Sequence, residues 1–265
     1  MQPEIELGPI TLQTFGICFA VGFLAAGAIL TRRFQELGRS GELAYGMVLS
    51  GLLGGLVGAR LYWMAENWDE AQDDLLGSLF SGAGLTWYGG AIGGTIGVVV
   101  WAWRQFEVST RLLDIAAVPL ALGYAIGRVG CQLSGDGDYG KPWDGPWAMA
   151  YPEGTVATDI AVHPTPIYET LAMGLIAWAL WRGRDALRPG LLFACYLVLS
   201  GLERFLVEFV RRNDETVAGL TTAQVESLVL VAAGIAWLAL AARRGGVRNP
   251  DAPRAGLAPT ARATA

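Results

Sequence analysis

The sequence predicts an all-α polytopic membrane protein with seven transmembrane helices, and two observations indicate this fold class. Of the 265 residues, 53% are hydrophobic and only 16% are charged, whereas soluble domains carry about 25% charged residues. Seven apolar runs also meet or approach the length of about 20 residues that a helix needs to cross a bilayer core. This composition excludes a soluble or nucleic-acid-binding protein, because the net charge of −5 comes with no basic tract.

The predicted helices follow the apolar runs in chain order. They are expected near residues 10–30, 45–64, 86–103, 112–126, 165–181, 191–210 and 222–242. Together they predict a single transmembrane domain over residues 1–245. The Pro/Ala/Arg-rich residues 246–265 are expected to form a disordered cytoplasmic tail.

The charges of the connecting segments predict the orientation of the helices. Arginines follow the first, third, fifth and seventh runs, whereas the connections at 66–74 and 136–163 are acidic. The positive-inside rule therefore places the N-terminus outside and the C-terminus in the cytoplasm. Arg211 and Arg212 fall on the outer side against this pattern, and pairing with nearby acidic residues can hold them there.

A polar segment at the outer end of the fourth run, residues 127–140, is the most informative part of the chain. It combines Arg128 with five glycines, two aspartates and a tyrosine at the edge of an apolar run. Membranes tolerate irregular backbone only where protein or water covers it, and arginine at membrane depth is usually functional. The segment and the long outward loop after it, near residues 136–163, are therefore candidates for the functional site.

Arg60, Arg128 and Arg204 are candidates for an anion site, because guanidinium groups bind phosphate in a bidentate manner. All three lie in or next to apolar runs. Glu208 follows Arg204 by four residues and shares its helix face. Structural ion pairing is therefore the alternative for each arginine, and the sequence leaves both interpretations open.

His163 and Tyr88 each have a functional and a structural interpretation. His163, the only histidine, is a general base or headgroup contact, or it belongs to a proline-fixed helix start, which the local sequence favours. Tyr88 is an acid–base group or an interfacial aromatic residue. Gly89 and Gly90 after it permit close approach of a ligand or of another helix.

No metal or cofactor is expected. The three cysteines form no CxxC pair and show no Cys/His spacing typical of a zinc site. No Walker pattern and no Ser/His/Asp set is present either.

The order and spacing of these motifs resemble the prolipoprotein diacylglyceryl transferase family over about residues 7–244. The strongest block is 127–140, which is similar to the family signature that begins Gly-Arg-x-Gly-Asn and ends in an acidic residue, an aromatic residue and glycine. Supporting blocks are GARLY at 58–62, GLTWYGG at 84–90, HPTPIYE at 163–169, ERFLVEFVR at 203–211 and LTTAQ at 220–224.

The resemblance implies a seven-helix enzyme of the bacterial inner membrane. It would transfer the diacylglyceryl group of phosphatidylglycerol to the lipobox cysteine of prolipoprotein signal peptides, forming a thioether and releasing glycerol phosphate. Arg128 and Arg204 would hold the phosphate and stabilise the leaving group. The implied catalytic residues are Arg128, Arg204, Tyr88 and Asp136. The implied substrate-binding residues are Arg60, Arg128, Arg204, Glu208, His163, Gly89 and Gly90.

Four positions depart from the family pattern. Tyr88 stands where the family often has a histidine that is assigned a base role, so Tyr88, or no side chain at all, replaces that histidine. Cys131 replaces the signature asparagine, Asp136 shortens its glutamate next to a one-residue insertion, and Phe15 lacks the hydroxyl of the commoner tyrosine. These departures motivate an alternative, a diverged paralogue with another acceptor or no activity. A transporter is a further alternative, although the sequence contains no inverted repeat.

Overall fold

A computed structural model describes residues 1–72, 74–80, 86–105, 109–216 and 219–249. The chain divides into two compact units. The large unit comprises Met1–Ala25 with Thr110–Ala265, and the small unit comprises Ala26–Ser109. Most of the predicted tail, residues 250–265, lies outside the described residues.

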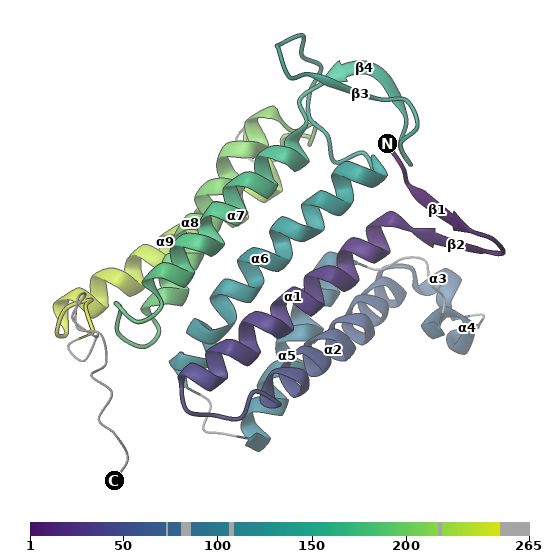
Figure 1. Ribbon diagram of the computed structural model, residues 1–265. Coiled ribbons are helices and arrows are strands. Elements are labelled where there is room, and N and C mark those ends of the chain that lie inside the picture. The colour runs from purple at the N-terminus through teal and green to yellow at the C-terminus, as the bar shows by residue number, and fades with distance from the viewer. Residues whose placement is uncertain (73, 81–85, 106–108, 217–218, 250–265) are drawn as a thin grey trace. The chain divides into compact units, whose positions relative to one another are not determined.

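Each predicted apolar run lies mostly in a helix of the structure (Figure 1). The helices are α1 (Thr14–Glu36), α2 (Leu43–Glu66), α3 (Trp68–Ala71), α4 (Leu75–Phe80), α5 (Trp87–Gln105), α6 (Thr110–Ser134), α7 (Thr165–Gly183), α8 (Leu191–Val207), the 3-10 turn η1 (Glu208–Val210) and α9 (Thr222–Arg243). Within the described residues, four helices are long and apolar enough to cross a membrane, namely α1, α2, α6 and α9. A mostly helical membrane protein is thereby confirmed.

Helix α6 is longer than the sequence suggested, and the predicted end near residue 126 was wrong. The helix continues to Ser134, so the first half of the polar segment is helical. Gly130 lies against the first helix, where an added Cβ would be 3.0 Å from the Cβ of Cys18, so the glycine serves helix packing. The helix ends where Gly135 adopts a positive φ of 61°, a conformation that glycine adopts without steric cost.

Two β-hairpins were not predicted. Strands β1 (Glu4–Leu7) and β2 (Ile10–Gln13) pair antiparallel, so the first helix begins at Thr14 rather than near residue 10. Strands β3 (Met149–Tyr151) and β4 (Thr158–Val162) pair within the predicted outward loop. Such short strands give only a weak sequence signal, because they contain three to five residues each.

The helices of the large unit pack in chain order. Contacts join α6 to α7, α7 to α8 and α8 to α9, and α6 also touches α8. Figure 1 shows β3 and β4 beyond the end of α6 that leads into the polar segment. At the other end of α6, the carboxylate of Asp114 accepts hydrogen bonds from the backbone N–H groups of Gly190, at 2.5 Å, and Phe193, at 2.9 Å. Asp114 therefore caps the first turn of α8 and fixes the two helices together.

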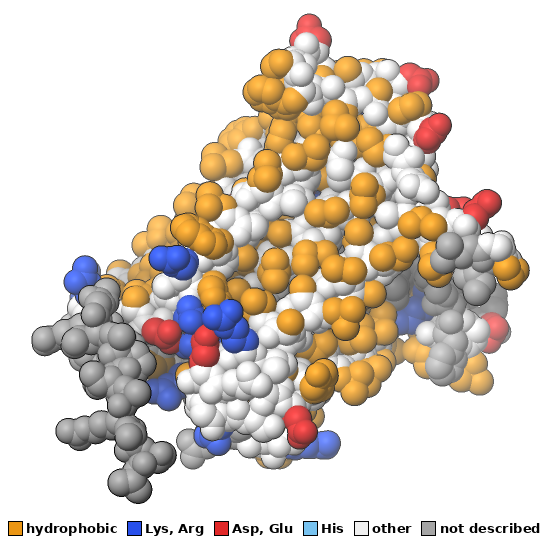
Figure 2. Space-filling view, viewed as in Figure 1, with side chains coloured by type: hydrophobic (Ala, Val, Ile, Leu, Met, Phe, Trp, Pro, Cys, Tyr) orange, Lys and Arg blue, Asp and Glu red, His pale blue; other side chains and the backbone are white. Residues whose placement is uncertain are grey.

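The surface of the large unit agrees with a membrane setting. Leu171, Leu175 and Trp178 form an exposed apolar stripe on α7. Figure 2 shows acidic side chains at the β3–β4 end and basic side chains near the C-terminal end of α9. Exposed residues there include Glu153 on the acidic end and Arg243 on the basic end. Charged side chains thus gather toward the ends of the helices, with acidic ones also beside the basic ones at the α9 end.

In the small unit, α2 and α5 pack closely along a row of glycines. A Cβ added at Gly89 would collide with the backbone of Gly58 and Ala59, and one added at Gly90 would meet the Cβ of Ala59 at 3.7 Å. Small residues allow this backbone approach between membrane helices. Gly89 and Gly90 thus serve a helix contact, which is the structural alternative that the sequence left open.

Candidate functional site

Buried charged side chains converge in the large unit where α6 ends, α7 begins and α8 passes into η1. The antiparallel order of these helices brings those three ends together. Glu169, on the second turn of α7, lies at the centre of this network and is fully buried. Its carboxylate accepts a hydrogen bond from Nη1 of Arg211 at 2.9 Å, forms an ion pair with Nε of Arg128, and lies 4.0 Å from Nη1 of Arg204.

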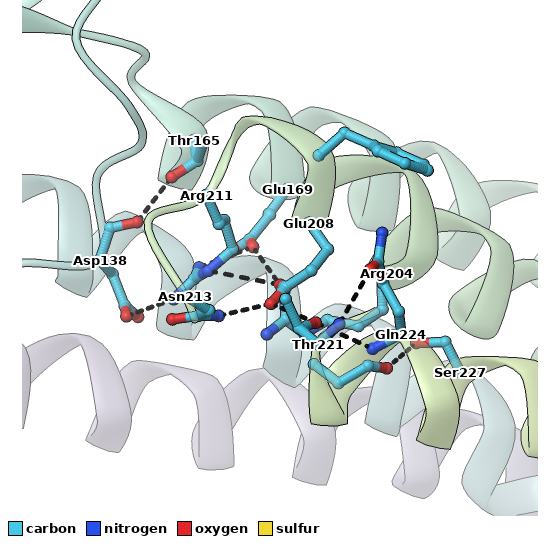
Figure 3. Close-up of polar contacts among 12 residues, drawn as sticks. Asp138, Thr165, Glu169, Arg204, Glu208, Arg211, Asn213, Thr221, Gln224 and Ser227 are labelled. Atoms are coloured by element: carbon cyan, nitrogen blue, oxygen red, sulfur yellow. Dashed lines mark hydrogen bonds and ion pairs between the residues drawn. The ribbon is translucent and has the colours of Figure 1, made fainter. Parts of the chain in front are cut away.

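Asp138 adds a second carboxylate from the loop after α6 (Figure 3). It pairs with Arg128 and with Nη2 of Arg211, the latter at 2.6 Å. Its backbone carbonyl accepts a hydrogen bond from Oγ1 of Thr165 at 2.6 Å, which attaches the loop to the start of α7. Asp136, the acidic residue chosen from the sequence, instead accepts a hydrogen bond from the backbone N–H of Asp138 at 3.3 Å. Asp138 is therefore the loop carboxylate that contacts the arginines.

Glu208 supplies the third carboxylate and links the network to α9. It pairs with Nη1 of Arg204 at 2.5 Å and accepts hydrogen bonds from Asn213 at 2.6 Å and from Oγ1 of Thr221 at 2.8 Å. Thr221 also forms a capping box with Gln224 at the start of α9 (Figure 3). The ion-pair interpretation of Arg204 and Glu208 is therefore correct for this structure.

The charges of the network balance. Within residues 109–216, three arginines (Arg128, Arg204 and Arg211) face three carboxylates (Asp138, Glu169 and Glu208). Buried charges are tolerated only when they are paired, because the loss of one partner leaves an uncompensated charge in a medium of low dielectric constant. The network can thus admit an additional anion only if a carboxylate moves away.

Several polar atoms around this network lack a hydrogen-bond partner within the described part of the chain. They are the hydroxyl of Tyr124, Nη1 of Arg204 and one carboxylate oxygen each of Glu169 and Glu208. Three of the four are held in ion pairs instead, Nη1 of Arg204 with Glu208 and the Glu169 oxygen with Nε of Arg128. Buried polar atoms are nearly always satisfied in folded proteins, so the Tyr124 hydroxyl, which has neither kind of partner among the described residues, calls for a bound ligand or water.

The loop carboxylate of Asp138 provides a test of the network through pH. Burial alone would raise the pKa of Asp138, but the positive charges of Arg128 and Arg211 outweigh burial and lower it. A group with a lowered pKa stabilises the fold above its unfolded pKa, about 3.9, and loses that contribution as the pH falls through its folded value. We therefore expect Asp138→Asn to reduce the thermal midpoint at pH 7, and the difference from the wild type to shrink below about pH 4. A difference that stays constant down to pH 2 would contradict the ion pairing.

His163 lies beside the network in an aromatic cluster. Its ring stacks on Trp143 with centroids 4.3 Å apart, and its Nδ1 lies 3.3 Å from the hydroxyl of Tyr168. The indole N–H of Trp147 donates a hydrogen bond to the same hydroxyl at 2.7 Å. Burial lowers the pKa of His163, so its imidazole is neutral at pH 7. The residue also directly precedes Pro164, the N-cap of α7, as the helix-start interpretation predicted.

The remaining predicted site residues belong to the small unit. Arg60 is buried, donates a hydrogen bond to the backbone carbonyl of Ser78 and places its guanidinium 4.2 Å from the ring centroid of Trp63. Tyr88 is exposed, with its ring 6.4 Å from that of Tyr62. Contacts with α2 and α4 therefore help to position Arg60, and a contact with α2 helps to position Tyr88.

Three members of the network were not predicted as site residues. Glu169 was recognised only as part of the HPTPIYE block, and Arg211 only as the end of the ERFLVEFVR block and an exception to the charge pattern. Asp138 was considered only as one of two residues, with Gly137, that could be the one-residue insertion. Arg211 could have been predicted as a member of the network, because an arginine on the predicted outer side breaks the positive-inside rule and requires an acidic partner.

A metal ion fits this region poorly. Potential ligand atoms of Cys131, Asp136 and Asp138 lie within 4.8 Å of one another. However, Arg128 and Arg211 already neutralise Asp138, and Nη1 of Arg128 lies 3.7 Å from Sγ of Cys131. Cationic side chains thus occupy the surroundings in which a metal ion would have to bind.

The fold and the site define a helical membrane protein with a buried, arginine-rich polar centre at one end of its helices. The sequence model of the family described as prolipoprotein diacylglyceryl transferase matches residues 3–240. The chain belongs to the prolipoprotein diacylglyceryl transferase family.

Individual relatives agree with this assignment. The chain is 32% identical to the phosphatidylglycerol–prolipoprotein diacylglyceryl transferase of Clostridium tetani (strain Massachusetts / E88), over 89% of this chain and 96% of the relative. It is 32% identical to the protein of the same name from Dehalococcoides mccartyi (strain ATCC BAA-2100 / JCM 16839 / KCTC 5957 / BAV1), over 87% of this chain and 89% of the relative. A Leptospira interrogans protein of that name is 31% identical over 76% of this chain and 72% of the relative.

Proposed function

We propose that this chain transfers the diacylglyceryl group of phosphatidylglycerol to the lipobox cysteine thiol of prolipoproteins. A sulfur–carbon bond forms, the bond between the glyceryl carbon and the phosphate oxygen breaks, and glycerol phosphate leaves with the electron pair. The relatives carry the names of both substrates. The single structural observation that supports this reaction is the buried arginine network around Glu169.

Arg128 and Arg204 hold the phosphate in this proposal. Their side chains keep 16% and 25% of their surface exposed, so both guanidinium groups remain within reach of a molecule from outside the chain. Negative charge grows on the phosphate oxygen as the carbon–oxygen bond breaks, and preorganised guanidinium groups stabilise it there. Glu208 and His163, in the same unit, complete the proposed substrate-binding set, whereas Arg60, Gly89 and Gly90 of the small unit remain predictions from the sequence.

The phosphate enters by displacing Asp138 from Arg128. Asp138 is the network carboxylate with the most exposed side chain, at 34%, whereas Glu169 and Glu208 are fully buried. It also sits on a loop that contains Gly135 and Gly137, both with positive φ. When Asp138 moves away, the incoming phosphate supplies the negative charge that Asp138 had supplied. The arginines therefore stay paired with negative charge throughout binding.

The thiol proton requires an acceptor, and Tyr88 or Asp136 is proposed for that role. A positioned acid–base group contributes about 10²–10⁴-fold to a rate. If Tyr88 is that group, Tyr88→Phe will lower kcat of the purified enzyme by at least about 100-fold. Unchanged turnover would remove Tyr88 from the mechanism and leave phosphate stabilisation as the main source of rate.

The proposal includes the membrane arrangement. The chain forms one domain of seven spans in the bacterial inner membrane, with the N-terminus outside and the C-terminus in the cytoplasm. The charge pattern of the connections supports this orientation. The arginine network then lies near the outer leaflet, on the side where secreted prolipoproteins emerge.

Rescue of a bacterial strain depleted of its own transferase tests the function. We expect this chain to restore growth and lipoprotein maturation. Failure of a well-expressed protein to rescue would favour the diverged paralogue that uses another acceptor. Transfer from labelled phosphatidylglycerol to a lipobox peptide by the purified enzyme provides the direct measurement.

A further inference from the structure

Tyr124 carries a buried hydroxyl group that neither the family signature nor the arginine network accounts for. The hydroxyl is buried and has no hydrogen-bond partner within the described part of the chain. The desolvation of an unpaired hydroxyl costs stability. A residue of this kind is therefore expected to have a partner that arrives with the substrate.

Tyr124 lies beside the arginine network. Tyr124 precedes Arg128 by four residues on α6, so the two share a helix face, and the Arg128 guanidinium lies 4.9 Å from the centroid of the tyrosine ring. The charges of Glu169, Glu203 and Arg204 also act on the Tyr124 hydroxyl. Next to it, Oγ1 of Thr170 donates a hydrogen bond to the backbone carbonyl of Ala125 at 3.3 Å, which fixes α6 against α7.

The depth of Tyr124 identifies the part of a phospholipid that it can reach. Four residues of α-helix correspond to about 6 Å, and Tyr124 lies that far from Arg128 toward the middle of α6. In a glycerophospholipid whose phosphate binds Arg128 and Arg204, the groups one step deeper are the ester carbonyls of the acyl chains.

The local charge also favours a neutral acceptor. The two arginines beside this hydroxyl are already paired, Arg128 with Glu169 and Arg204 with Glu208. A second anion therefore gains little there. An ester carbonyl accepts a hydrogen bond without bringing a charge.

We infer that Tyr124 determines specificity for ester-linked glycerolipids by donating a hydrogen bond from its hydroxyl to an ester carbonyl of the bound lipid. The inference rests on the proposed function, because the phosphate of the lipid must first bind Arg128 and Arg204. It goes further by assigning a contact to the acyl-ester region of the substrate.

A cycle of two enzymes and two lipids tests this inference. The wild type and Tyr124→Phe are assayed with diacyl phosphatidylglycerol and with its dialkyl ether analogue, using a lipobox peptide as acceptor. We expect the wild type to prefer the ester lipid about tenfold in kcat/KM, the effect of one net hydrogen bond to a buried group. Tyr124→Phe is expected to lose that preference. If the ratio of kcat/KM for the ester lipid to kcat/KM for the ether lipid is equal in both enzymes, the inference is overturned. That result is expected if a bound water is the only partner of the Tyr124 hydroxyl.

The stability of the ligand-free enzyme gives a second readout. Because Tyr124→Phe removes an unsatisfied hydroxyl, its thermal midpoint is expected to equal or exceed that of the wild type. A lower midpoint would mean that the hydroxyl has a structural partner, which contradicts the inference. Tyr196→Phe on α8 is the matched control, because Tyr196 lies eight residues before Arg204 and packs on Phe193 with ring centroids 5.6 Å apart. It is expected to retain the ester preference.

The outcome separates this inference from the proposed function. Absence of transfer by the wild type with diacyl lipid would refute the proposed reaction. In that case, the increase in thermal midpoint that each lipid gives to the wild type and to Tyr124→Phe is measured instead of transfer. An ester preference in the wild type that disappears in Tyr124→Phe would still support the contact, whereas equal stabilisation by both lipids would overturn it.

Discussion

Replacing Glu169 with alanine is expected to lower the free energy of unfolding by about 3–5 kcal/mol. Glu169 is fully buried and contacts Arg128 and Arg211, with Arg204 at 4.0 Å. Its removal leaves those guanidinium groups buried with too few carboxylates, and buried unpaired charge carries a large desolvation penalty. The decrease is measured by thermal and denaturant unfolding in detergent.

A surface variant provides the control for this experiment. Asp185 pairs with Arg184 at 3.8 Å, but 48% of its side chain is exposed, and exposed ion pairs contribute at most about 1 kcal/mol. Asp185→Ala is therefore expected to shift stability by about 0.5 kcal/mol or less. Similar losses in Glu169→Ala and Asp185→Ala would show that the buried network does not stabilise the fold.

Replacing Arg128 with lysine is expected to reduce kcat for diacylglyceryl transfer by about 100-fold. Lysine keeps the positive charge beside Asp138 and Glu169, so the change tests geometry rather than charge. It loses the planar fork with which arginine binds phosphate oxygens in a bidentate manner. Transfer of labelled diacylglycerol to a lipobox peptide measures the effect.

Arg184→Lys is the matched control at the opposite end of α7. Arg184 lies 4.1 Å from the ring centroid of Trp181 and donates a hydrogen bond to its carbonyl at 2.7 Å, far along the helix from Glu169. Its replacement is expected to leave kcat unchanged. Full activity of Arg128→Lys would exclude bidentate phosphate binding at Arg128 as a source of rate.

The helices were predictable because long apolar runs carry a strong signal. The prediction for 165–181 differs from α7 by two residues at its end, and 222–242 differs from α9 by one. The end of α6 was not predictable from hydropathy, because Arg128 and Gln132 are polar and yet helical. A tertiary contact accompanies this extension, since Arg128 forms an ion pair with Glu169 within it.

The site was predictable only as a set of unusual residues. Arg128 and Arg204 were found because arginine is rare within apolar runs, and the structure brings both to Glu169. Pairing partners lie far apart in sequence, as with Arg211 and Asp138, which are separated by 73 residues. No local pattern indicates which of Asp136 and Asp138 turns toward the arginines, because that choice depends on the glycine-containing loop around them.

Arg128 meets its fully buried carboxylate partner on the very next helix of the chain. During biosynthesis, a lone α6 would carry an unpaired arginine into the bilayer, at a cost that insertion measurements put at up to about 3 kcal/mol. In the proposed seven-span arrangement, α7 brings Glu169 into the bilayer and removes much of this cost, so insertion of the two helices as a hairpin would be favoured. The ion pair that organises the site would then also favour an order of assembly, in which α6 enters the bilayer together with α7.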